Sequence, residues 1–128
     1  MQVTSALVKL VHDSRPTIQV DYCFLVSEET QKKTTVLTAC DVSTGMTMSA
    51  GVEEKGVNDY AQHELARFVL ECGRGGGVLQ PGVVQSDQEP AIRKLLRKVC
   101  GLTGMSLRHA PVYTSRSQGA VERWHRTL

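Results

Sequence analysis

The segment "IQVDYCFLV" (residues 18–26) decides how the rest of this sequence can fold. It is rich in β-branched and aromatic residues, follows Pro16 and ends at the polar stretch "SEETQKK", which is the pattern of a strand followed by a hairpin turn. Two more β-rich segments come next, "TTVLTACDV" (34–42) and "MTMSAGV" (46–52), joined across "STG". Because strands with such short connections pair antiparallel, the sequence predicts a three-stranded antiparallel meander.

Helical and strand patterns alternate after the meander. The segment 58–74 begins with helix N-cap residue types, and the segment 89–102 carries Pro90 in its first turn; both then place apolar residues at helical spacing. Short strands are predicted at 82–87 and 105–110, and a last helix closes the chain. The order β-β-β-α-β-α-β-α predicts an α/β fold in which a mixed five-stranded sheet is flanked by helices.

Length and composition are those of one globular domain. The chain has 128 residues, of which 41% are hydrophobic and 22% charged, as in ordinary folded proteins. No apolar run approaches membrane-spanning length, and Lys9 and His12 interrupt the opening segment. We therefore expect no membrane partner and a nuclear or cytoplasmic location.

Basic residues are concentrated in the second half of the chain. Residues 1–57 carry five Lys/Arg against seven Asp/Glu, whereas residues 58–128 carry ten against six. Beyond Pro90 the only acid is Glu122, and it is accompanied by eight basic residues: Arg93, Lys94, Arg97, Lys98, Arg108, Arg116, Arg123 and Arg126. This distribution suits a polyanionic partner, although a solvated helix face has the same charge pattern.

Three carboxylates occupy places where a fold can hold them rigidly. Asp21 lies inside the first predicted strand, Asp87 ends the fourth and Glu122 lies in the first turns of the last helix. Side chains at strand ends can converge in such sheets, and carboxylates are the ligands that Mg²⁺ prefers. The cysteines and histidines, by contrast, have no zinc-ligand spacing.

Three segments carry a resemblance to a known family: "VDYCFL", "VVQSDQEPAI" and "APVYTSRSQGAVERWHRTL". Together they resemble the catalytic core of retroviral and retrotransposon integrases, within the ribonuclease H-like polynucleotidyl transferase superfamily. The strongest match is the last segment, where the family has a tyrosine-containing loop followed by Ser-x-Gly-x-x-Glu on a helix. The matching residues here are Tyr113, Ser117, Gln118, Gly119 and Glu122.

The resemblance implies a ribonuclease H-like fold and a DDE site made of Asp21, Asp87 and Glu122. These acids would be both the catalytic residues and the ligands of two Mg²⁺ or Mn²⁺ ions. The implied activity is metal-dependent DNA 3′-end processing and strand transfer, and the implied partner is double-stranded DNA, as element end and as target. The residues expected to contact DNA are Tyr113, Arg116, Ser117, Gln118, Arg123 and Arg126.

The resemblance also divides the chain. Residues 1–17 are interpreted as a leader or linker, and residues 18–128 as the integrase core, truncated at its C-terminal end; a homo-oligomer is possible in the full-length protein. One departure follows Asp87, where Glu89 and Pro90 replace a usual glycine. Glu89 could disturb metal binding, or simply begin the helix, where the helix dipole favours a carboxylate.

Three functions stay open at this point. The first is an integrase core, and the second is a cut-and-paste DDE transposase or a nuclease on the same scaffold. The third is a catalytically silent, DNA-binding remnant, which Glu89 and the truncation favour. Asp41, which also ends a predicted strand, is interpreted as a turn-forming residue beside Ser43 and Gly45, and Trp124 as a packing residue.

Overall fold

The computed structural model describes residues 15–77, 82–109 and 119–128. Its strands and helices follow one another in the predicted order. They are β1 (Thr17–Val26), β2 (Lys33–Asp41), β3 (Thr47–Val52), α2 (Asp59–Glu71), β4 (Val83–Ser86), α3 (Pro90–Thr103), β5 (Ser106–His109) and α4 (Gly119–Thr127). None of the helices in these described ranges is long and apolar enough to cross a membrane.

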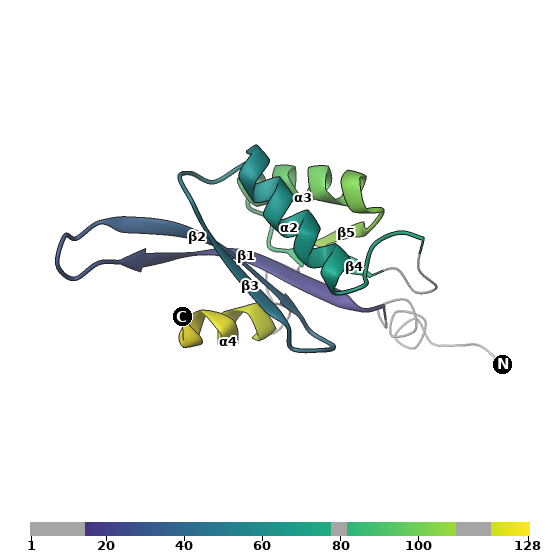
Figure 1. Ribbon diagram of the computed structural model, residues 1–128, viewed down its shortest axis with the longest axis horizontal. Helices are drawn as coiled ribbons and strands as arrows, with labels where there is room; N and C mark the ends of the chain where they lie inside the picture. Colours follow the sequence, from purple (N-terminus) through teal and green to yellow (C-terminus); the bar gives the residue numbers. More distant parts are fainter. Residues whose placement is uncertain (1–14, 78–81, 110–118) are drawn as a thin grey trace.

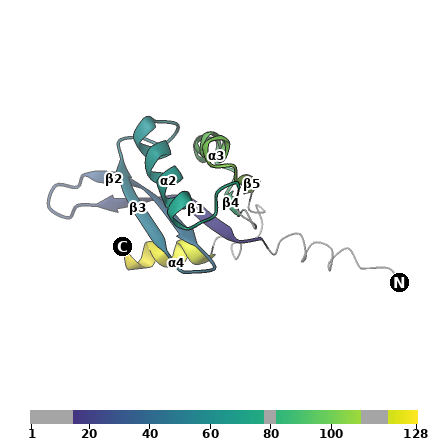
Figure 2. The same ribbon diagram turned by 45° about the vertical axis from the view of Figure 1, so that its right-hand side comes forward.

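The strands form one five-stranded mixed sheet in the order β3-β2-β1-β4-β5. The predicted meander is confirmed, because β1 pairs antiparallel with β2 and β2 antiparallel with β3. β4 then pairs parallel with β1, and β5 parallel with β4. Figures 1 and 2 show α2 and α3 on one face of this sheet and α4 on the other.

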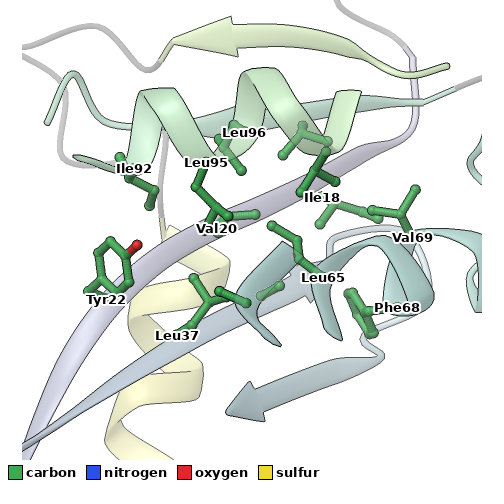
Figure 3. Close-up of a cluster of buried hydrophobic side chains, with 14 of the residues drawn as sticks. Ile18, Val20, Tyr22, Leu37, Leu65, Phe68, Val69, Ile92, Leu95 and Leu96 are labelled. Atoms are coloured by element: carbon green, nitrogen blue, oxygen red, sulfur yellow. The ribbon is translucent and has the colours of Figure 1, made fainter. Parts of the chain in front are cut away.

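The two faces of the sheet differ in chemistry because successive side chains of a strand point to opposite sides. In β1, Ile18, Val20 and Tyr22 join the buried apolar cluster formed with α2 and α3 (Figure 3). The intervening residues, Gln19 and Asp21, therefore face α4. The core lies on the α2 and α3 side, and the polar side of the sheet is where a site can be built.

Local signals set the ends of the two core helices. The Asn58 side chain caps α2 by accepting a hydrogen bond of 2.8 Å from the backbone N–H of Ala61, as expected of an N-cap. Pro90 occupies the start of α3, where its missing N–H costs nothing. Gly104 ends α3 with φ at 78°, a conformation that favours glycine.

Asp41 has the predicted turn role and a second role that the sequence did not indicate. Its Oδ1 accepts a 3.0 Å bond from the Ser43 N–H, and its backbone oxygen accepts one from Gly45. Its carboxylate, fully buried, also pairs with Arg74, whose Nε lies 3.0 Å from Asp41 Oδ2. The end of β2 is thereby tied to the segment that follows α2.

Candidate metal centre

Asp21 lies in the middle of β1, on the face that α4 covers. Its Oδ1 accepts a 2.8 Å hydrogen bond from the backbone N–H of Tyr22. The pKa of the Asp21 carboxyl is raised from 3.8 to about 6. Burial is the largest cause and the negative charges of Asp87, Glu89 and Glu122 add to it, while the hydrogen bond from Tyr22 acts in the opposite direction. Asp21 is thus half-buried among acids, in a position where ionisation is unfavourable.

Asp87 directly follows β4, the parallel neighbour of β1. Gln85 pairs with Gln19 in this ladder, so Asp87 and Asp21 each lie two residues beyond a paired position. The Asp87 side chain is exposed, and its Oδ1 accepts a 3.0 Å bond from the Glu89 N–H. The register of two parallel strands, together with this tight turn, explains how the charge of Asp87 reaches Asp21.

Glu122 is an exposed residue in the first turn of α4, and contacts of Gln19, Val121 and Trp124 help to dock this helix on the polar face. Gln19 Oε1 accepts hydrogen bonds from the backbone N–H groups of Ala120 (3.0 Å) and Val121 (3.1 Å). The Val121 side chain is fully buried, and Trp124 Nε1 donates a 3.1 Å bond to the backbone oxygen of Met48 in β3. These contacts agree with a packing role for Trp124.

Gln19 is a site-supporting residue that the sequence interpretation missed. It accepts from N–H groups at the start of α4 that have no partner within the helix, and thereby acts as a cap supplied by another element. A polar amide between the apolar residues Ile18 and Val20 of a predicted strand is the signal that could have revealed it, because a buried polar group needs a partner.

Glu89 stands at the start of α3, and its charge also raises the pKa of Asp21, so the structure shows a feature of each of its two interpretations. Glu89 occupies the N-cap position without a side-chain capping bond. Its Oε1 lies 2.6 Å from Lys55 Nζ, and that ammonium also lies 5.3 Å from the centre of the Tyr22 ring. The additional acid is therefore bound to a lysine, which partly offsets its charge beside Asp21.

The three predicted acids come from three separate parts of the chain. Asp87 and Glu122 are near enough to Asp21 to affect its ionisation, although the three side chains do not form a compact cluster. Both Asp87 and Glu122 raise the pKa of Asp21. In the described part of the chain, no three Asp, Glu, His or Cys side chains are close enough together to hold one metal ion. The donor set still fits a hard divalent cation, because it consists of carboxylates whose mutual repulsion a cation would relieve.

The residues expected to contact DNA are only partly within the described ranges. Arg123 and Arg126 are exposed on α4, next to Glu122. Tyr113, Arg116, Ser117 and Gln118 lie outside the described residues. On α3, Lys94, Arg97 and Lys98 are exposed along one helix that carries no acid, so α3 and α4 both present basic side chains to solvent.

Comparison with known proteins gives a likeness of fold without a sequence match. No protein-family model matches the chain, and no curated protein matches it by sequence. A chain of the simian T-cell lymphotropic virus intasome, in complex with PP2A regulatory subunit B56 gamma, superposes with a TM-score of 0.63 at 17% identity. That alignment covers 88% of this chain and 37% of the viral one.

Two structures of the HTLV-2 integrase catalytic core domain, both in complex with magnesium, are also similar. The dimeric form gives a TM-score of 0.57 at 15% identity, covering 88% of this chain and 68% of that one. The trimeric form gives 0.56 at 14% identity, covering 86% and 64%. The chain thus spans a little over a third of the intasome chain and about two thirds of the core domains. It has the ribonuclease H-like fold of retroviral integrase catalytic cores.

Proposed function

We propose that this chain is the catalytic core of a retroelement integrase, which carries out metal-dependent DNA 3′-end processing and strand transfer. The observation that carries the proposal is the electrostatic link among Asp21, Asp87 and Glu122 on an integrase-core fold. The pKa of the half-buried Asp21 carboxyl is raised to about 6, first by burial and then by the charges of Asp87, Glu89 and Glu122. Carboxyl groups with strongly shifted pKa values cluster at functional sites, and a cation among these acids would offset their repulsion.

Asp21, Asp87 and Glu122 would hold two Mg²⁺ or Mn²⁺ ions. The chemistry that such ions supply is polarisation of phosphate oxygens and charge stabilisation in in-line displacement at phosphorus. The role of the chain itself is to hold the three carboxylates in place. Asp21 is fixed by the sheet and Asp87 by its turn, while Glu122 is held by the docking of α4; no covalent nucleophile is required of the protein.

Double-stranded DNA, as element end and as target, is the proposed partner. Arg123 and Arg126 are exposed beside Glu122, where they would contact phosphates without reading base sequence. The loop residues Tyr113, Arg116, Ser117 and Gln118 are proposed to contact the reactive DNA end. An Arg126→Gln protein should bind DNA with a salt slope smaller by about one.

A cut-and-paste transposase or nuclease would use the same three acids, and product analysis with longer DNA substrates separates it from an integrase.

A silent DNA-binding remnant is the alternative that a specific observation favours. That observation is the open arrangement of the described acids, with Glu89 bound to Lys55 beside them. Under this alternative the fold and the basic surface are retained, and the carboxylates bind no cation.

The first test is Mn²⁺ binding by calorimetry at moderate salt, which damps nonspecific charge effects. The wild-type chain is compared with Asp87→Asn and with Glu28→Gln, an exposed acid in the β1–β2 turn. Binding that is lost only in Asp87→Asn supports the proposed site. If all three folded proteins fail to bind Mn²⁺ both alone and with DNA present, the remnant is the better account. DNA cleavage without metal that survives Asp21→Asn would contradict the proposal.

A further inference from the structure

His125 and Thr38 form a polar contact between α4 and the strand that bears Asp21. Thr38 lies in β2 directly opposite Asp21 in the antiparallel pairing, and its side chain is fully buried. Thr38 Oγ1 donates a 2.9 Å hydrogen bond to the backbone oxygen of Asp21. The same hydroxyl oxygen lies 2.6 Å from His125 Nε2.

The number of available hydrogens sets the direction of this contact. A threonine hydroxyl has one hydrogen, and here it is given to the Asp21 carbonyl. The oxygen of Thr38 can therefore only accept from His125, which assigns a hydrogen to Nε2. Two bonds then run in series, from the His125 N–H to the Thr38 hydroxyl and from this hydroxyl to the backbone of Asp21.

This series of bonds connects the elements that carry two of the three acids. His125 lies three residues after Glu122, so the two side chains are neighbours along one side of α4. Gln19 holds the first turn of the helix and Trp124 holds it to β3. The His125 bond joins α4 to the Thr38 side chain in β2, and the Thr38 hydroxyl is in turn bonded to the backbone of Asp21.

We infer that His125 and Thr38 are positioning residues, which fix α4 on the sheet so that Glu122 is held beside Asp21. The inference rests on the proposed function, since it gives these residues a role at the same metal site. Neither side chain is proposed to bind metal or DNA. Supporting residues of this kind commonly change metal affinity by ten- to a hundredfold when they are removed.

The test uses two substitutions that remove the contact and two that keep it. Thr38→Val preserves shape and removes the hydroxyl, whereas Thr38→Ser preserves the hydroxyl. His125→Ala removes the ring, whereas His125→Gln places an amide nitrogen at the same number of bonds from Cβ as Nε2. Mn²⁺ affinity by calorimetry and amide hydrogen exchange across residues 119–127 are measured for each protein.

Thr38→Val and His125→Ala are expected to weaken Mn²⁺ binding about tenfold and to speed amide exchange in α4. Thr38→Ser and His125→Gln should restore both to within about twofold, which general loosening of the fold would not do. Wild-type affinity and exchange in folded Thr38→Val and His125→Ala would overturn the inference and leave the proposed function intact.

If the wild-type chain binds no Mn²⁺ either alone or with DNA present, the proposed function has failed, and the positioning contact is then judged by amide exchange alone. It stands if exchange rises in Thr38→Val and is rescued in Thr38→Ser. It is overturned if the two proteins exchange alike.

Discussion

Replacing Asp21 by Asn should stabilise the metal-free protein at pH 8. In the folded chain the Asp21 carboxyl is partly buried and surrounded by the charges of Asp87, Glu89 and Glu122, which together raise its pKa to about 6. In the unfolded chain these causes are absent and the carboxyl has its usual pKa, so the ionised carboxylate destabilises the folded state relative to the unfolded one. An asparagine keeps an oxygen that can accept the Tyr22 N–H and carries no charge.

The size of the effect follows from the pKa. A rise from 3.8 to about 6 corresponds to about 3 kcal/mol, at about 1.4 kcal/mol for each pH unit. Solvent reaches part of the Asp21 side chain and screens its charge, so we expect about 1–2 kcal/mol. The contribution of Asp21 to the stability of the wild-type chain is fully present below about pH 3.8 and is lost as the pH rises through about 6.

Urea unfolding of the wild-type and Asp21→Asn proteins at pH 4 and pH 8, without divalent metal, measures this effect. The stability advantage of Asp21→Asn should be about 1–2 kcal/mol larger at pH 8 than at pH 4. Glu28→Gln, an exposed acid in the β1–β2 turn, is the control and should show little change. An advantage that is the same at both pH values, or a variant less stable at pH 8, would refute the electrostatic account of Asp21.

Three further predictions concern the contacts that hold the site and the core. Gln19→Ala should cost about 1–2 kcal/mol, as for loss of a helix cap, and should speed amide exchange in α4, whereas the exposed Gln88→Ala should change neither. Arg74→Met leaves the buried Asp41 carboxylate without its ion-pair partner and should cost about 3–5 kcal/mol in urea unfolding; adding Asp41→Asn should recover much of this loss. Leu65→Ala removes a fully buried side chain and should cost about 2–5 kcal/mol.

The Asp41 and Glu89 carboxylates show what kind of feature escapes a reading of sequence. The turn role of Asp41 depends on neighbours within four residues and was predicted correctly. Its ion pair with Arg74 joins residues 33 positions apart, and the pair of Lys55 with Glu89 joins residues 34 apart. Neither pair has a local signal, because nothing in the flanking sequence specifies which distant charge will be adjacent.

The sequence by itself determined the elements and their order. Alternation of apolar and polar residues and the spacing of apolar residues in the helices are local patterns, and the burial of one face follows from them. The tertiary structure alone decided how α4 lies on the polar face, through Gln19, Trp124 and the bond between His125 and Thr38. The physical reason is that each of these contacts joins residues far apart in the chain, so that it exists only once the sheet has formed and presented its polar face.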